Sequence, residues 1–318
     1  MNSILITGAS GFIGQCLLGL LKTKNYKLRL GVRNNSKLID PEAARESVFL
    51  DMDSSSSISE AIVKNIDIVI HLAGQAHDEH ASGKRLYQVN AEGTKKLAEV
   101  SESQGVKLFI YISTIKVHGS GSLSQMFSED SLLEPQDDYA NSKLQGEYAL
   151  IDICEKGKMQ YVILRPPLVF GPGVKANFLK LLSLIDRNYP LPFANFNNLR
   201  SYIYVENLCH LIEGIIYRKS CRNQIYLVKD CDMSTKDLVS EISKAFGNPP
   251  NIFHMPIIFL KIIVSIFNKK KDFERLYSSL VIDNSRLQKD LGWVASVDTS
   301  TAMANTVDWY KQSRKGAN

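Results

Sequence analysis

The chain has 318 residues, 44% of them hydrophobic and 22% charged, with a formal net charge of +5 at pH 7. This composition is typical of a soluble globular protein with one large or two smaller domains. The basic residues are scattered, so an anionic small molecule is a plausible ligand and no nucleic-acid groove is indicated. The five cysteines show no C-x-x-C pair and no His cluster, which predicts reduced thiols in a cytoplasmic protein without a metal site.

The first half of the chain alternates short β-branched runs with helical patterns. "MNSILITGAS" enters a strand at once, with no basic n-region or cleavage site of a signal peptide. The predicted strands are residues 3–7, 27–32, 47–51, 67–73, 107–114 and 160–166. The predicted helices are residues 13–23, about 57–64, 91–105 and one that opens at "DDYANSKLQGE" (137–147). Strictly alternating elements of this length predict an α/β fold, a Rossmann-type doubly wound parallel sheet covered on both faces.

The pattern loosens after Pro167 and becomes richer in Pro, Asn and aromatic residues. One segment here, "PIIFLKIIVSIF" (256–267), is strongly apolar and is followed by "NKKK". It is too short to span a bilayer and Lys261 interrupts it, which favours a buried or groove-lining helix. Contact with a membrane surface is the alternative, because basic residues flank the apolar run.

A glycine-rich turn follows the first predicted strand. "ILITGASGFIG" (4–14) places Gly8, Gly11 and Gly14 between that strand and the first helix. Such glycines permit a tight turn and a close approach of the backbone to a pyrophosphate. The helix start at Phe12 and Ile13 offers free N–H groups at a positive dipole end. Because the strand and the helix supply the required context, the motif predicts dinucleotide binding over residues 1–167.

The end of the second predicted strand bears on the choice of cofactor. NAD-binding folds usually carry an acidic residue there, which accepts from the ribose 2′-hydroxyl. In "LRLGVRNNS" this position holds Val32, and Arg33 follows. An arginine pairs with a 2′-phosphate, so NADP(H) is favoured over NAD(H); a surface arginine without a ligand is the alternative. After the third strand, Asp51 and Met52 suit the adenine pocket.

A hydroxyl, a phenol and an ammonium are predicted to meet near this turn. Ser113 and Thr114 end a predicted strand, at the edge where ligands bind in doubly wound sheets. Tyr139 and Lys143 lie four residues apart on the next helix and therefore on one face. A lone Y-x-x-x-K is usually two ordinary surface residues. Beside a dinucleotide site, the three groups predict proton exchange with a sugar or alcohol oxygen, coupled to hydride transfer with a nicotinamide.

With these motifs in place, the whole chain resembles the extended short-chain dehydrogenase/reductase family, and within it the nucleotide-sugar epimerases, dehydratases and reductases. The resemblance rests on motifs in family order: "TGASGFIG", "HLAG" (71–74), "VNAEGT" (89–94), "STIKVHG", "YANSK", "RPPLVFGPG" (165–173), "RSYIYVENL" (200–208) and "LGW" (291–293). It implies that Tyr139 is the catalytic acid/base. It also implies that Lys143 holds the nicotinamide ribose and lowers the pKa of that phenol, and that Thr114 hydrogen-bonds the reacting oxygen.

The resemblance implies further contacts and an assembly. Cofactor contacts carry over to Leu72, Ala73, Gly74 and Pro166, and UDP-sugar contacts carry over to Asn177, Phe178, Arg200 and Arg275. For the two arginines, membership of a surface ion pair is the alternative. Asn90 fits the family's asparagine near the active site, or serves the sheet structurally, and His71 belongs to the nicotinamide-side loop or is simply a strand end. The resemblance implies that residues 168–318 are mainly a substrate-binding region, interleaved with the last sheet elements. It also implies a homodimer.

The residues after Thr114 distinguish between the chemistries of the group. Dehydratases carry an Asp-Glu pair there, whereas this chain has Ile115 and Lys116, which argues against dehydration. His118 stands where a tyrosine is usual. A 4-keto reductase of the UDP-N-acetylquinovosamine type, acting in surface-polysaccharide precursor synthesis, is favoured, and Arg33 agrees with a released NADP(H). A UDP-hexose 4-epimerase is the alternative, and a non-catalytic NAD(P)-binding regulatory protein is a remote one.

Overall fold

The computed structural model describes residues 2–33, 47–75, 83–122, 126–256, 258–260 and 277–315. The strands are β1 (Ser3–Thr7), β2 (Lys27–Val32), β3 (Ser47–Phe49), β4 (Ile68–His71), β5 (Leu108–Ile112), β6 (Gln160–Arg165), β7 (Leu168–Phe170), β8 (Leu199–Tyr204), β9 (Gln224–Leu227) and β10 (Cys231–Ser234). The α-helices are α1 (Phe12–Lys22), α3 (Glu60–Val63), α4 (Gly83–Tyr87), α5 (Gly93–Ser103), α6 (Asp138–Lys156), α7 (Ala176–Asp186), α8 (Val205–Tyr217), α9 (Thr235–Phe246), α12 (Ser285–Leu291) and α13 (Thr299–Lys315). Single turns of 3₁₀-helix are η1 (Ser55–Ser57), η3 (Ile115–His118) and η4 (Lys219–Cys221), and η2 (Gln88–Glu92) is a π-helical turn.

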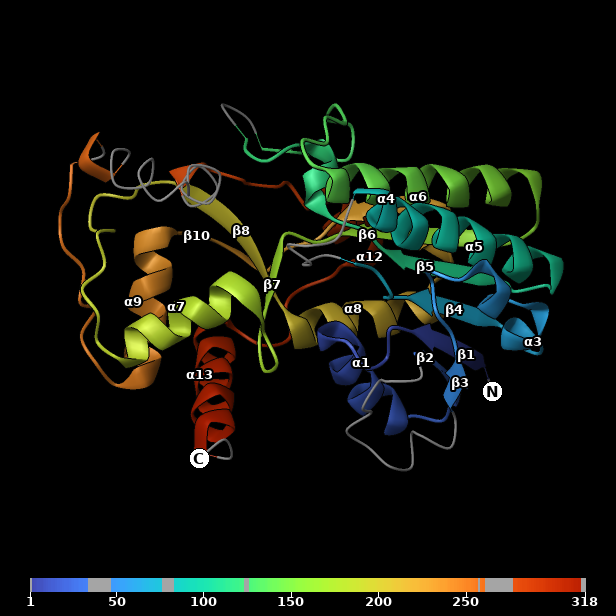
Figure 1. The fold of residues 1–318 in the computed structure, drawn as a ribbon, viewed down its shortest axis with the longest axis horizontal. Helices are drawn as coiled ribbons and strands as arrows, with labels where there is room; N and C mark the ends of the chain where they lie inside the picture. The colour runs from blue at the N-terminus through green and yellow to red at the C-terminus, as the bar shows by residue number, and fades with distance from the viewer. Residues whose placement is uncertain are drawn as a thin grey trace.

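The main sheet has seven strands in the order β3-β2-β1-β4-β5-β6-β9, and every pairing in it is parallel. Parallel neighbours need crossover connections, and the intervening helices supply them. In Figure 1, α5 and α6 cover one face of the sheet, and α1 and α8 cover the other. The predicted doubly wound α/β fold is confirmed.

The side chains of β1 alternate between the two faces of the sheet, which explains why there is a hydrophobic core on each face. Ile4 and Ile6 are fully buried on the face packed against α1 and α8, where Leu17 and Ile212 join them. Leu5 points to the opposite face and packs in a second cluster with side chains of α5 and α6. Because both faces are covered by helices, the inner strands read as continuous apolar runs.

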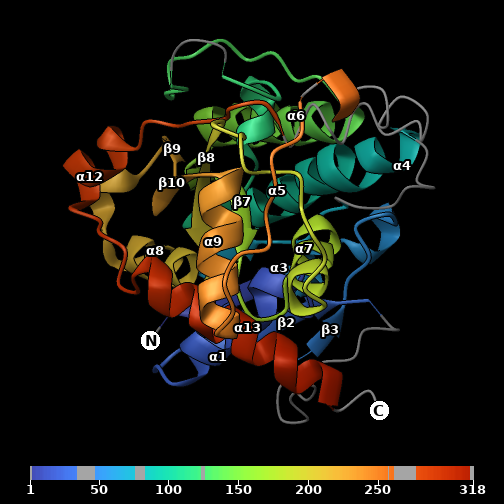
Figure 2. The same cartoon turned by 90° about the vertical axis from the view of Figure 1, so that its left-hand side faces the viewer.

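A smaller lobe follows the sheet strand β6. Its three-stranded sheet has the order β10-β8-β7, with β10 antiparallel and β7 parallel to β8. Figures 1 and 2 show α7, α9 and α13 gathered around this sheet. Helix α9 begins at a capping box formed by Ser234 and Asp237, and it ends at Gly247 in the left-handed conformation. Between β8 and β10 the chain passes back to the main sheet through α8 and β9.

Two predicted segments differ from the structure or lie outside it. The helix predicted near residues 57–64 is a 3₁₀ turn followed by the shorter α3. The reason is that the Ser57 hydroxyl donates to the carbonyl of Asp51 at 2.7 Å and folds the serine run into a turn. Most of 256–267 lies outside the described residues, although Leu260 is buried against Phe196. Across the described helices, none is long and apolar enough to cross a membrane.

Candidate active site

The turn between β1 and α1 forms a cradle of backbone N–H groups. Gly8 has φ +71°, and a Cβ there would lie 2.7 Å from the Ala73 nitrogen. A Cβ on Gly14 would lie 2.2 Å from the Gly8 carbonyl oxygen. Gly11 is the N-cap of α1, and among the described residues no side chain caps this helix start, so the N–H groups of Phe12 and its neighbours are available. The residues present therefore fit a dinucleotide pyrophosphate.

The residues predicted to meet the adenosine follow the second and third strands, β2 and β3. Strand β2 ends at Val32, and Arg33 follows on the surface, where it makes other polar contacts. Asp51 lies just beyond β3, and its carboxylate accepts from the Asp53 backbone at 3.2 Å. The Met52 side chain is buried. Asp51 and Arg33 thus lie at the carboxyl ends of adjacent strands, the edge at which such sheets bind nucleotides.

His71 organises the loop after β4 through a chain of hydrogen bonds. The Thr7 hydroxyl accepts from the Ala73 N–H at 3.2 Å and contacts His71 Nδ1 at 2.6 Å. His71 Nε2 contacts the Thr94 hydroxyl at 3.0 Å, and that hydroxyl donates to the Asn90 carbonyl at 2.7 Å. With Thr94 donating onward, Nε2 carries the proton and Nδ1 accepts from Thr7. Complete burial keeps the pKa of His71 well below its usual value, so the ring is neutral.

Asn90 fastens the same loop to the helix that carries Tyr139. Its side-chain oxygen accepts from the Gln75 N–H at 2.8 Å, and its Nδ2 donates to the Gln75 carbonyl at 3.0 Å. Nδ2 also donates to the Ser142 hydroxyl at 3.0 Å. These three hydrogen bonds make Asn90 a clamp between the β4 loop and α6. Gly74 lies beside it, where a Cβ would be 3.1 Å from Asn90 Oδ1.

Thr114, Tyr139 and Lys143 meet where β5 and α6 approach each other. Thr114 is the N-cap of η3 at the end of β5, and Tyr139 lies in the first turn of α6, which Asp137 caps. The Thr114 hydroxyl is a hydrogen-bond partner of the Tyr139 phenol. Lys143 follows one turn later and is buried, with Nζ 4.1 Å from the centroid of the Tyr111 ring. The three predicted groups are therefore brought together.

Burial shifts the protonation of these groups. Burial and the Asp137 carboxylate raise the pKa of Tyr139 to about 12, while the Thr114 hydrogen bond lowers it. Burial lowers the pKa of Lys143 to about 7, and the Glu147 carboxylate opposes that shift. The net pKa of the phenol is thus raised by burial and Asp137, and the expected lowering by Lys143 stays a prediction. The lysine is itself desolvated, and a group that loses charge on burial does little to stabilise a phenolate.

A buried ion pair beneath the three residues was not predicted. Arg165 Nη2 donates to Glu147 Oε2 at 2.5 Å, and its Nε donates to both carboxylate oxygens at 3.1 and 3.2 Å. The Ser113 hydroxyl, next to Thr114, donates to the same carboxylate. Glu147 lies two turns beyond Tyr139 on one face of α6. The spacing of Tyr139, Lys143 and Glu147 was the one signal in the sequence that could have indicated it.

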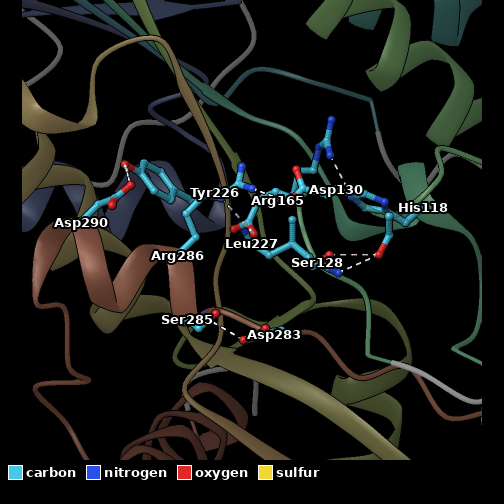
Figure 3. A network of polar contacts seen from close by, with 12 residues as sticks. His118, Ser128, Asp130, Arg165, Tyr226, Leu227, Asp283, Ser285, Arg286 and Asp290 are labelled. Atoms are coloured by element: carbon cyan, nitrogen blue, oxygen red, sulfur yellow. Dashed lines mark hydrogen bonds and ion pairs between the residues drawn. The ribbon is translucent and has the colours of Figure 1, made fainter.

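His118 extends this network towards the C-terminal region. Its Nε2 accepts from Arg165 Nη1 at 2.8 Å, and its Nδ1 donates to the Leu132 carbonyl at 3.1 Å. Burial and the adjacent guanidinium lower its pKa to about 4, so the ring is neutral and can accept. Figure 3 shows this pair of residues with the nearby contacts of Asp130 and Arg286, whose ion pair joins the 128–132 segment to α12.

Three of the four residues predicted to meet the sugar nucleotide lie in the smaller lobe, on α7 and β8. Asn177 is exposed in the first turn of α7, whereas the Phe178 side chain is buried and stacks on Phe170 at 5.7 Å. Phe178 can therefore meet a diphosphate through its backbone N–H. Arg200 on β8 donates to the Ser278 carbonyl at 2.9 Å. Two further predicted contacts, Leu72 and Pro166, lie just beyond β4 and β6, and Arg275 lies outside the described residues.

The glycine turn and the cluster of Thr114, Tyr139 and Lys143 lie at the same carboxyl edge of a Rossmann sheet. This combination defines a dinucleotide-dependent enzyme. The sequence profile of the "NAD dependent epimerase/dehydratase family" matches residues 4–228. The chain belongs to this family, as the motifs predicted.

A relative supports this membership, and two solved structures share the fold. The chain is 36% identical over 300 residues to a UDP-glucose 4-epimerase of Vibrio cholerae, covering 92% of this chain and 90% of the relative. It superposes with TM-score 0.80 and 22% identity on a UDP-glucuronic acid 4-epimerase from Bacillus cereus in complex with NAD, covering 99% and 98% of the two chains. RMD from Pseudomonas aeruginosa complexed with NADPH gives TM-score 0.76 at 19% identity, covering 98% of this chain and all of that one.

Proposed function

We propose that this enzyme carries out NAD(P)-dependent chemistry at carbon 4 of a UDP-sugar, as a 4-epimerase. The observation that carries the reaction type is the meeting of Thr114, Tyr139 and Lys143 at the sheet edge that also holds the glycine turn. The similarity to the Vibrio cholerae UDP-glucose 4-epimerase, which extends over nine-tenths of both chains, supports the epimerase assignment and the UDP-sugar class.

The chain's own residues have distinct roles in this proposal. The chemistry that a bound nicotinamide supplies is hydride transfer with carbon 4 of the sugar. The phenolate form of Tyr139 takes the proton from the 4-hydroxyl during oxidation, and the phenol returns it during reduction, while Thr114 holds the reacting oxygen through its hydroxyl. Lys143 lies between Gly74 and Tyr111, where its ammonium can hydrogen-bond the ribose next to the nicotinamide. The N–H groups at the start of α1 and α7 bind the two diphosphates.

A 4-keto reductase is the second candidate, favoured by the end of β2. That strand ends at Val32 without a carboxylate, and Arg33 follows, a residue that suits a 2′-phosphate and hence a cofactor that is exchanged in every turnover. The reductase was our first expectation. It is the second candidate because the Vibrio cholerae relative, which this chain matches over nine-tenths of both lengths, is a UDP-glucose 4-epimerase.

Two incubations separate the candidates. The first contains UDP-glucose or UDP-N-acetylglucosamine without added cofactor, and the second contains a UDP-4-keto-6-deoxy sugar with NADPH. In the first incubation, an epimerase converts the gluco sugar into its galacto epimer and consumes no added nucleotide. A reductase loses absorbance of the reduced nicotinamide one for one with the ketone reduced. Loss of NADPH in the second tube with no change in the first would reverse our ranking.

We also propose that the chain assembles as a homodimer. Light scattering of the purified protein should give twice the mass of one chain, and a single-chain mass at micromolar concentration would refute this.

A further inference from the structure

A second lysine lies beside the Tyr139 phenol. Lys116 stands two residues after Thr114, in the turn η3, and its N–H donates to the Thr114 hydroxyl at 3.3 Å. Its ammonium nitrogen lies over the Tyr139 ring, 5.5 Å from the ring centroid. The aromatic face attracts cations, and it does so more strongly when the ring carries the negative charge of a phenolate. Lys116 therefore favours the deprotonated form of Tyr139.

Asp137 holds this ammonium and acts on the phenol in the opposite direction. One carboxylate oxygen accepts from the Ala140 N–H at 2.8 Å and caps α6, and the other lies 3.3 Å from the Lys116 nitrogen. The carboxylate also raises the pKa of Tyr139. About a third of each of the two charged side chains is accessible, 32% for Lys116 and 29% for Asp137, so water screens the pair less than an exposed one.

We infer that Lys116 and Asp137 are a positioning pair that sets how readily the Tyr139 phenol gives up its proton. The inference rests on the proposed role of Tyr139 as acid/base. The pair holds opposite charges near one ring, so that neither dominates while both are present. Removing one member exposes the effect of the other, and the two removals must shift the phenol in opposite directions.

Other groups near the phenol do not supply this pair of opposing effects. Thr114 is uncharged and only donates or accepts a hydrogen bond. Lys143 packs over the neighbouring Tyr111 ring and loses charge on burial. Glu147 is committed to Arg165 two turns along α6.

The experiment reads the phenol directly. Full-length protein labelled with ¹³C at the tyrosine ζ carbon, with NAD⁺ added, is titrated from pH 8 to pH 13 by NMR, and Tyr139→Phe identifies the Tyr139 resonance. Lys116→Met should move its titration to higher pH and Asp137→Asn to lower pH, each by about half to one unit. Asparagine retains the helix cap, so α6 keeps its start. Lys116→Arg should restore the wild-type curve.

A distant ion pair provides the matched control. Lys107 and Asp67 lie 2.7 Å apart at the opposite end of the sheet strands, so Lys107→Met removes one positive charge without touching the phenol. Overlapping curves for wild type, Lys116→Met and Asp137→Asn, or shifts of the same sign in both variants, would overturn the inference. The titration contains no sugar, so a wild-type enzyme that failed to turn over a UDP-sugar would refute the proposed function and leave this measurement intact.

Discussion

Arg165 binds the Glu147 carboxylate through two nitrogens: Nη2 lies 2.5 Å from one oxygen, and Nε lies within 3.2 Å of both. Both side chains are almost completely buried. Arg165 ends β6 and Glu147 lies in the middle of α6, so the pair fastens the helix that carries Tyr139 and Lys143 to the main sheet. An ion pair in this position fixes geometry more than it adds net stability.

The first prediction concerns this pair. Arg165→Met should lower the free energy of unfolding by about 3–5 kcal/mol, because it leaves the Glu147 carboxylate buried and uncompensated. The double variant with Glu147→Leu should lose less than the single one. Urea denaturation measures all three. The exposed pair of Lys107 and Asp67 is the control, where Lys107→Met should lose under about 1 kcal/mol. Equal losses in the single and double variants would show that packing, not charge, explains the effect.

The second prediction tests the acid/base. Tyr139→Phe keeps the ring and removes the proton donor, so turnover should fall by about 10²–10⁴ while NAD(P) binding is retained. Steady-state assays with a UDP-sugar measure turnover, and cofactor fluorescence measures binding. Tyr148→Phe changes an exposed tyrosine of the same helix and should leave both unchanged. Near-normal turnover in Tyr139→Phe would remove this residue from the mechanism.

The third prediction uses two glycines close together in sequence. Gly8→Ala forces a side chain into φ +71° and to 2.7 Å from the Ala73 nitrogen, so the variant should lose stability and cofactor affinity together. Gly19 lies exposed in α1 with open space around its Cβ position, and Gly19→Ala should raise stability by about 0.5–1 kcal/mol without altering cofactor affinity. Thermal unfolding and cofactor titration are the measurements. A harmless Gly8→Ala would contradict the close approach of the β1 and β4 loops.

The fourth prediction concerns the choice of cofactor. If Arg33 pairs with a 2′-phosphate, Arg33→Ala should weaken NADPH binding by about 1.5–3 kcal/mol and leave NADH binding nearly unchanged. Calorimetric titration with each cofactor gives the two affinities. Arg218→Ala, an exposed arginine at the end of α8, serves as the control for loss of one positive charge. The same loss for NADPH and NADH would mean that Arg33 does not recognise the 2′ position.

The fifth prediction concerns stability in acid. The pKa of His118 is about 4 in the folded protein, below the usual 6.5, so the unfolded chain binds more protons between these values. The contribution of His118 is therefore fully present above pH 6.5 and is lost as the pH falls towards 4. His118→Gln cannot titrate and should flatten the fall in unfolding free energy over this window. An unchanged slope in urea titrations from pH 4 to 7 would exclude His118 as its source.

Local patterns in the sequence were sufficient to predict the sheet and the meeting of Thr114, Tyr139 and Lys143. Strand β1 is an apolar, β-branched run and β2 alternates leucines with polar residues, and the predicted bounds of both agree with the structure. The meeting of Thr114 with Tyr139 also followed from topology, because strand ends and helix starts converge on one edge of a parallel sheet. The serine run near Ser57 misled the helix prediction, since its side chains bond the backbone in a turn.

Contacts between distant segments could not be predicted in this way. In the sequence, nothing distinguishes Arg165 and Glu147 from other charged residues. Only the packing of α6 on β6 makes them partners. The pKa of Tyr139 depends on desolvation and on Asp137, and the Tyr–Lys spacing reveals neither of these influences. The clamp formed by Asn90 likewise depends on how the β4 loop folds back on α6.

The position of β9 has a consequence for synthesis on the ribosome. This strand is residues 224–227, yet it pairs with β6, which ends at Arg165. Until those later residues leave the exit tunnel, β6 presents an unpaired edge, and such edges recruit foreign strands. The helix α8, which covers the face beside α1, emerges equally late. A nascent chain that stalls between residues 167 and 224 should therefore be a substrate for chaperones, and fragments cut at the lobe boundary should aggregate.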